Sequence, residues 1–330
     1  MELEVVQDIE SIDSGILIPE FLAAFNDAFQ KSGVQSLNKF IRSIDCAKWT
    51  IYSDYAFKGK VNDVITFSIL PYMYDFSMFK KAMTDLAPRD IKNTNSVKKE
   101  FLEVLRNMPI MHIAIVLNRK RKINFFDEKN FLLHKTKAII SLLEHWNENA
   151  SKSTGNYLMK IKHFKSLGNE LKKNSPNLSV IRDIEIVATL VSYIIIEMSL
   201  AKEMEIIGWF SDRDTILNYM KGNTVNPIIF DLVDLYTFAL SKSQKMAKRP
   251  SLVYGIPEES DAMWYDEFNR IPDHIAGAIA DYDISNNAVS NNKFKGIIEE
   301  VMASNENLLY YKLILEKSKI QTSRILIETT

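Results

Sequence analysis

The β-rich part of the chain begins with Trp49-Thr-Ile-Tyr-Ser-Asp54 and continues, after a polar turn at 58–63, with Val64-Ile-Thr-Phe-Ser-Ile-Leu70. Both runs are rich in β-branched and aromatic residues, and the first one alternates. Two runs of this kind joined by a short polar segment predict an antiparallel β-hairpin. Asp54 ends the first strand, so the hairpin would place a carboxylate at the edge of a sheet.

Downstream of the hairpin, helical and strand patterns alternate. Helices are predicted at 76–86, 97–106, 184–201 and 271–280, and strands at 111–117 and 204–210. Asn95 or Ser96 would cap the second of these helices, and Pro272 and Asp273 suit the first turn of the last one. Strands separated by helices indicate a mixed sheet with helices packed on it, so the expected fold class is α/β.

Two further regions have helical character. An amphipathic stripe that includes Phe21, Phe25 and Phe29 predicts helices within residues 1–48. Residues 128–178 also follow a helical pattern, with a polar break at 147–156. We therefore expect a helical N-terminal extension over 1–48, followed by one domain over 49–330 with a helical insertion at about 128–178.

Composition limits the classes of function. The 330 residues are 46% hydrophobic and 25% charged, as in a globular protein, and 41 basic residues against 42 acidic ones give a net charge of -1. The chain is not a polycation, so nucleic-acid binding would depend on local patches. Its single cysteine, Cys46, excludes an internal disulfide framework and a multi-cysteine zinc site.

No membrane or secretory signal is expected. The first residues, MELEVVQDIESID, are acidic and lack an apolar core. The most apolar stretch, Ile184–Ala201, is interrupted by Glu185 and Glu197, and its uninterrupted part is too short to span a bilayer. We expect a soluble, cytoplasmic protein in which this stretch is a buried helix.

Four carboxylates stand where a sheet would bring them together. Asp54 and Asp212 each end a predicted strand, Asp273 lies at the start of a helix, and Asp90 follows a helix end. Converging carboxylates are a hard-oxygen site suited to Mg²⁺ or Mn²⁺, and two such ions about 4 Å apart can promote hydrolysis of a phosphodiester. Each Asp taken alone is also typical of a turn, a cap or a solvated position.

Basic residues form clusters that could contact phosphates. The candidates are Arg119, Lys120, Arg121 and Lys122, which precede Phe125 and Phe126, together with Lys245, Lys248 and Arg249. The aromatic rings could stack on unpaired bases. The alternative for each cluster is a solvated face, with the phenylalanines in the core.

The order of these segments resembles a bacterial family known as domain of unknown function 3800, which has an RNase H-like fold. The similar segments are Tyr52-Ser-Asp54, Ile65-Thr-Phe-Ser-Ile-Leu-Pro71, Asp90-Ile-Lys92, Ile113-Ala-Ile-Val-Leu-Asn-Arg119, Ile206-Ile-Gly-Trp-Phe-Ser-Asp-Arg213 and Ile271-Pro-Asp-His-Ile-Ala-Gly-Ala278. The resemblance covers about 49–285, with 128–178 poorly matched. It implies an RNase H-like mixed sheet and a two-metal site, in which Asp54 bridges the ions, Asp90 and Asp212 each hold one, and Asp273 completes the second.

The chain also departs from the family pattern. Tyr55 and Phe57 stand where the family has Glu and Gly, the glycine pair after the second strand is absent, and Asn118 replaces a frequent Asp. The resemblance implies a metal-dependent nuclease acting on DNA or RNA, with a role in bacterial defence against phage. The alternative is a catalytically inactive RNase H-like module that binds nucleic acid or a protein partner, and a homo-oligomer stays open. Asp214, Asp281 and Asp283 are close enough in sequence to replace a site residue.

Overall fold

The computed structural model describes residues 15–72, 75–149, 154–219, 227–256, 263–317 and 319–328. The chain forms two compact units. A sheet unit comprises residues 23–121, 197–214 and 250–330, and a helical unit comprises residues 1–22, 122–196 and 215–249. All four candidate carboxylates belong to the sheet unit.

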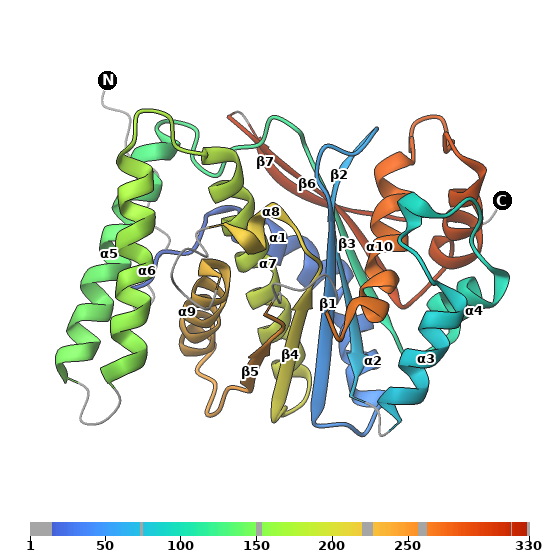
Figure 1. Ribbon diagram of the computed structural model, residues 1–330, viewed down its shortest axis with the longest axis horizontal. Helices are drawn as coiled ribbons and strands as arrows, with labels where there is room; N and C mark the ends of the chain where they lie inside the picture. Colours follow the sequence, from blue (N-terminus) through green and yellow to red (C-terminus); the bar gives the residue numbers. More distant parts are fainter. Residues whose placement is uncertain are drawn as a thin grey trace. The chain divides into compact units, whose positions relative to one another are not determined.

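The sheet unit contains a mixed seven-stranded sheet (Figure 1). Its strands are β1 (Lys48–Ala56), β2 (Asp63–Pro71), β3 (Met111–Leu117), β4 (Ile206–Ser211), β5 (Ser251–Tyr254), β6 (Leu308–Glu316) and β7 (Lys319–Ile325), in the order β5-β4-β1-β2-β3-β6-β7. The strands β1, β2 and β3 pair antiparallel in succession, β4 lies parallel to β1 and β5 parallel to β4. Strand β6 extends the other edge parallel to β3, and β7 pairs antiparallel with β6.

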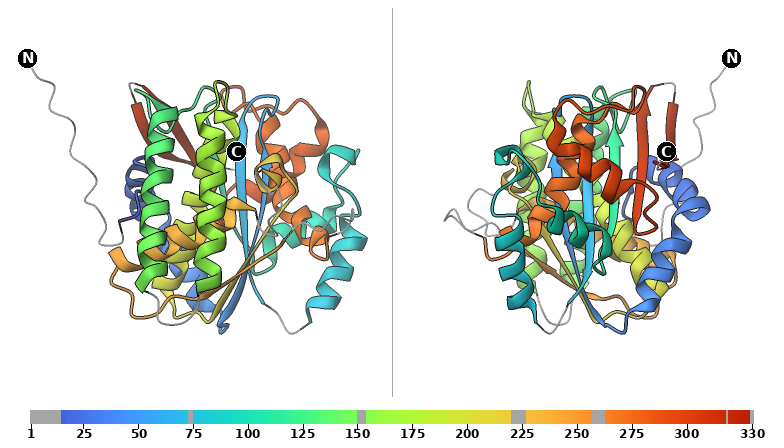
Figure 2. Two further views of the ribbon diagram at one scale, coloured as in Figure 1. Left: turned by 60° about the vertical axis from the view of Figure 1, so that its left-hand side comes forward. Right: turned by 90° about the vertical axis from the view of Figure 1, so that its right-hand side faces the viewer.

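One face of the sheet carries α3 (Phe76–Leu86), α4 (Lys99–Asn107) and α10 (Asp266–Asp281), which Figures 1 and 2 show together on the same side. Tyr52 of β1 stacks on Phe210 of β4 and on Phe268 of α10. The short helices η1 (Ile91–Asn93), η2 (Asn292–Phe294) and η3 (Ile297–Met302, a π-helix) belong to the same layer. Because side chains alternate along a strand, Asp54 points to the same face as Tyr52.

The opposite face of the sheet packs against α1 (Phe21–Ser32) and α2 (Val34–Ser43). Phe25 of α1 meets Tyr311 of β6 edge to face, and Phe40 of α2 meets Trp49 of β1 in the same way. Gly33 separates the two helices, and a side chain there would collide with the Tyr311 hydroxyl. The predicted N-terminal helices are confirmed for residues 21–43, and residues 1–14 lie outside the described part of the chain.

The helical unit contains α5 (Glu128–Asn149), α6 (Thr154–Lys172), most of α7 (Leu178–Ala201), α8 (Thr215–Asn218) and α9 (Ile228–Ser243). It is larger than the insertion predicted at 128–178, because α7 and α9 pack with α5 and α6 in one core. Lys135 of α5 is buried there and donates to Glu185 of α7 at 2.6 Å. The Tyr236 hydroxyl of α9 donates to the same carboxylate.

The predicted hairpin is confirmed. Strands β1 and β2 pair antiparallel with Asp54 opposite Thr66. The predicted helix at 76–86 and the strand at 111–117 have the observed bounds, and the second predicted helix begins at Lys99. Asn95 or Ser96 does not cap it, since Lys98 occupies the N-cap position without a side-chain bond.

The predicted start of the last helix is wrong. Helix α10 begins at Asp266, so Pro272 and Asp273 lie in its interior. Pro272 has no N–H, and the Phe268 carbonyl therefore lacks its usual helical donor. The helix continues through this position because Phe268, Ile271 and Ile275 are buried against the sheet unit's core.

Helix α7 is, among the described residues, long and apolar enough to cross a bilayer. However, 94% of its most apolar window is buried within the protein. This is the burial of a core helix, which the sequence predicts for this stretch.

Candidate functional site

Two of the predicted carboxylates meet at the ends of adjacent parallel strands. Ser53 of β1 is in register with Ser211 of β4, and the next residue along each strand is an aspartate. The Asp212 N–H donates to the Ser53 carbonyl at 2.8 Å, which holds the two strand ends together. The carboxyl groups of Asp54 and Asp212 lie close enough to share a hydrogen bond, which raises the pKa of Asp54. A hydrogen bond between two carboxyl groups requires a proton on one of them.

Helix α10 brings the third carboxylate over this point. Asp273 accepts a hydrogen bond from the Ile91 N–H at 2.6 Å, so it is held by η1 as well as by its own helix. Asp90 precedes Ile91 and lies close enough to Asp212 and Asp273 to affect the titration of both. Four residues far apart in the sequence therefore converge on one face of the sheet unit.

The three central carboxyls have raised pKa values. Burial, followed by the charges of Asp273 and Asp212, raises the pKa of Asp54 well above its ordinary value. Burial and the neighbouring charge of Asp90 also raise the pKa of Asp212. For Asp273, burial and the charges of Asp90 and Asp212 outweigh the Ile91 hydrogen bond and raise the pKa to about 7. Like charges crowded in a buried site hold protons, and a cation would displace them.

Asp90 is already paired with a cation. Its carboxylate contacts the Arg270 guanidinium, and Lys92 lies 3.7 Å away. Arg270 lies one turn before Asp273 on α10, and its side chain is 19% exposed. No group of three or more His, Cys, Asp or Glu in the described ranges has the arrangement of a complete metal-ligand set. The donor types fit Mg²⁺ or Mn²⁺, but Arg270 holds Asp90 in a pair that a metal would have to replace.

The sequence did not single out three residues around these carboxylates. Arg270 was missed because the helix was predicted to begin at Ile271. Asn269 is buried. When its side-chain amide is turned so that both ends are paired, the nitrogen donates to the Phe210 carbonyl and the oxygen accepts from the Asp212 N–H, each at 3.2 Å. Thr66 is fully buried directly opposite Asp54, and its hydroxyl has no hydrogen-bond partner within the described part of the chain. It therefore offers an additional oxygen on the face that carries Asp54.

The side chain of Tyr55 points away from the candidate carboxylates. It follows Asp54 and so points to the other face of β1, where its hydroxyl bonds to Ser53 at 2.8 Å and to Ser211 at 2.7 Å. The Trp209 ring N–H donates to the same Ser53 hydroxyl. Tyr55 thus ties β1 to β4 from behind the carboxylates.

The alternative carboxylates have structural partners of their own. Asp281 accepts from the backbone and side chain of Ser290, both at 2.5 Å. Asp283 accepts from the backbone N–H groups of Ser285 and Asn286. His274, which follows Asp273, is buried; its ring bonds to the Arg270 carbonyl, and burial lowers its pKa to about 4.

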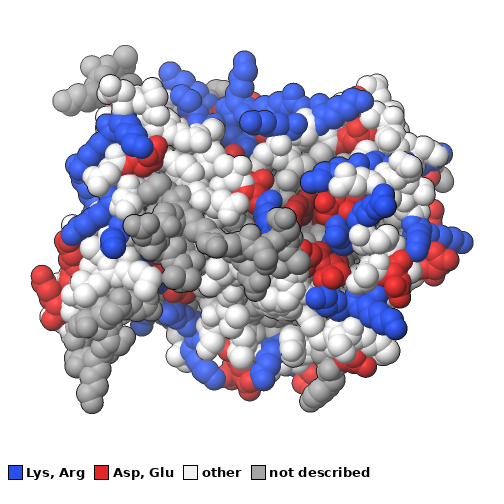
Figure 3. All heavy atoms as spheres, viewed as in Figure 1, with Lys and Arg blue, Asp and Glu red and all other residues white. Residues whose placement is uncertain are grey.

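The predicted basic residues differ in their surroundings. Arg119, Lys120 and Lys122 are exposed, and Arg119 donates to the carbonyls of Gly59 and Lys60. Arg121 is buried, donates to Asp63 at 2.6 Å and lies over the Phe57 ring, so it has a structural role and not a surface one. Lys245, Lys248 and Arg249 are exposed on the helical unit. The face drawn in Figure 3 carries both basic and acidic side chains, in keeping with the net charge of -1.

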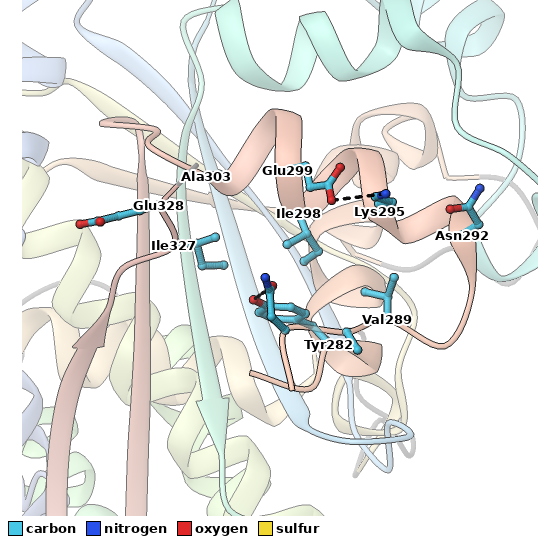
Figure 4. A pocket seen from close by; sticks show the side chains of 11 residues that line it. Tyr282, Val289, Asn292, Lys295, Ile298, Glu299, Ala303, Ile327 and Glu328 are labelled. Atoms are coloured by element: carbon cyan, nitrogen blue, oxygen red, sulfur yellow. Dashed lines mark hydrogen bonds and ion pairs between the residues drawn. The ribbon is translucent and has the colours of Figure 1, made fainter. Parts of the chain in front are cut away.

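A cavity of about 610 Å³ lies elsewhere in the sheet unit (Figure 4). The side chains of Tyr282, Asn292, Ile298 and Ile327 line it, and a Lys295–Glu299 ion pair lies at its wall. None of the four candidate aspartates lines this cavity. It therefore does not belong to the carboxylate site.

Comparison with known proteins gives no identification: no family model, no curated protein and no solved structure matches this chain.

Proposed function

We propose that this protein is a metal-dependent nuclease that hydrolyses phosphodiesters at the site formed by Asp54, Asp90, Asp212 and Asp273. The observation that carries the proposal is the convergence of Asp54, Asp212 and Asp273, from two strand ends and a helix, with all three pKa values raised. Such crowding destabilises the folded protein in the absence of a cation. Titratable groups whose pKa values are strongly perturbed by burial and by neighbouring charges are found most often at functional sites.

The topology supports an RNase H-like interpretation. The order β3-β2-β1-β4-β5, with an antiparallel trio extended by two parallel strands, is the order expected of an RNase H-like sheet. The succession of hairpin, Asp90 segment, β3, long helix, β4 and α10 also follows the order of the family that the sequence resembles. Strands β6 and β7 are additional to that core.

The protein's own residues would prepare the site in two ways. Asp54, flanked by the other carboxyls, would give up its proton when a divalent cation enters. Arg270 would leave Asp90 at the same moment, and its cationic group would then be available to the phosphate of a substrate. Bound Mg²⁺ or Mn²⁺ would supply the polarisation of the phosphodiester and the activation of water that this chemistry needs.

One observation favours the alternative, a catalytically inactive module that binds nucleic acid or a protein partner. The Arg270–Asp90 pair neutralises one carboxylate within the protein itself. If this pair is permanent, the remaining carboxyls would serve only to join β1, β4 and α10. A role in defence against phage and a cytoplasmic location rest on the resemblance and the composition alone.

The test is incubation of the purified protein with labelled single- and double-stranded DNA and RNA, with Mg²⁺, Mn²⁺ or EDTA. The active-site variant is Asp54→Asn/Asp212→Asn, which keeps the size of both side chains. The matched control is Asp27→Asn/Asp45→Asn, which removes two charges from exposed positions in the same unit.

Metal-dependent cleavage by the wild type and the control, lost in the active-site variant, is the expected result. Cleavage that persists in Asp54→Asn/Asp212→Asn would assign the activity to another site or to a contaminant. No cleavage of any substrate, with no metal-dependent rise in the melting temperature, would establish the inactive module instead.

A further inference from the structure

The helical unit has a cavity of about 490 Å³ that is lined by aromatic and basic side chains. Trp146 of α5, Tyr157 of α6 and Phe238 of α9 contribute three rings to its wall. The Trp146 ring lies 5.2 Å from that of Phe238, nearly perpendicular to it, and 6.1 Å from that of Tyr157. All three rings are half-buried, so each presents part of its surface to the cavity.

Basic groups surround one of these rings. The Arg249 guanidinium lies 5.6 Å from the centre of the Phe238 ring, and the Lys242 ammonium lies 5.7 Å from it. Both side chains belong to exposed residues. Lys160 also lines the cavity, but Asp234 at 2.6 Å and Asp231 at 3.7 Å balance its charge.

The combination of rings and cations selects the class of ligand. Aromatic walls alone would suit a cationic ligand such as a quaternary ammonium, but Arg249 and Lys242 repel one. A nucleotide has both features that the cavity can recognise: a flat base, which stacks on Trp146 and Tyr157, and a phosphate, which the two cations attract.

We propose that this cavity binds one nucleotide of a single-stranded nucleic acid, with its base against Trp146 and Tyr157 and its phosphate beside Arg249 and Lys242. Arg249 belongs to the basic cluster with Lys245 and Lys248 that the sequence predicts to contact phosphates. The inference deepens the proposed function by naming a strand-binding site, but binding here needs neither a metal nor the carboxylates.

The test is binding of a fluorescein-labelled 12-mer, as DNA and as RNA, to the full chain in EDTA, measured by fluorescence anisotropy. Trp146→Ala should weaken binding about tenfold, the usual magnitude for loss of one stacking contact, and Trp146→Phe should restore most of it. Arg249→Ala should also weaken binding and should lower the dependence on salt. An abasic 12-mer with the same phosphates should bind the wild type about as weakly as the ordinary strand binds Trp146→Ala.

Tyr72→Ala is the matched control, because Tyr72 is an aromatic residue that is 50% exposed and does not line the cavity. Equal binding by the wild type and a folded Trp146→Ala variant, or a loss in Tyr72→Ala alone, would overturn the proposal. Equal affinity for abasic and ordinary strands would do the same. Since the assay contains EDTA, failure of the nuclease proposal leaves its result unaffected.

Discussion

Replacing Asp273 with Asn should stabilise the metal-free protein at neutral and alkaline pH. The pKa of Asp273 is raised from 3.8 to about 7 by burial and by the charges of Asp90 and Asp212. Between these values the folded protein holds a proton that the unfolded chain has released. The free energy of unfolding therefore falls as the pH rises from 3.8 and reaches its full loss above about 7.

The magnitude follows from the same shift. A displacement of about 3 pKa units corresponds to about 4 kcal/mol, an upper value because the neighbouring carboxyls adjust their own protonation. Asn does not titrate, so the variant does not lose stability at this position as the pH rises. Its side-chain oxygen can still accept a hydrogen bond from the Ile91 N–H. We expect Asp273→Asn to match the wild type near pH 4 and to be more stable by about 1–4 kcal/mol at pH 8.

Thermal unfolding in EDTA at several pH values measures this difference. Asp281→Asn is a suitable control on the same helix, since it weakens the two bonds to Ser290 and should give no gain at high pH. A destabilised Asp273→Asn at pH 8, or a difference that does not change with pH, would refute the argument from charge crowding. In the presence of Mn²⁺ the wild type should be more stable than Asp273→Asn, because the metal stabilises only the protein that retains the carboxylate.

Three further substitutions test the structure around the site and in the helical unit. Tyr55→Phe should cost about 1–3 kcal/mol, because the hydroxyls of Ser53 and Ser211 lose their shared partner, while Mn²⁺ binding measured by calorimetry should not change. Gly277→Ala would place a methyl group 2.6 Å from the Ile91 side chain and push η1 away. This change should lower the melting temperature and weaken Mn²⁺ binding. An unchanged affinity for Mn²⁺ would contradict the role of Ile91 in holding Asp273. Lys135→Met should cost about 3–5 kcal/mol, since it leaves Glu185 buried without its cation. Adding Glu185→Gln, which removes the charge but keeps an acceptor for the Tyr236 hydroxyl, should recover most of the loss in chemical denaturation.

The sequence predicted those parts of the fold that depend on local pattern. The hairpin, the strand at 111–117 and the helix at 76–86 were found because alternation and helical periodicity report which side of an element is buried. The start of α10 was predicted wrongly, because Pro272 looks like a first-turn residue when only neighbouring residues are considered. Strands β5, β6 and β7 were not predicted, although they extend the sheet at its two edges.

The candidate site, like the fold, could be predicted from the sequence only in part. The residues that end strands, Asp54 and Asp212, could be chosen from the sequence because a strand end is a local feature. That Asp273 accepts a hydrogen bond from Ile91, and that Arg270 pairs with Asp90, depends on contacts across about 180 residues of chain. Such contacts are decided by the packing of α10 on the sheet unit's core. The sequence alone therefore determined which carboxylates could form a site. Only the tertiary structure decided that they meet, that burial and neighbouring charges raise the pKa of three of them, and that a cation of the protein already pairs with the fourth.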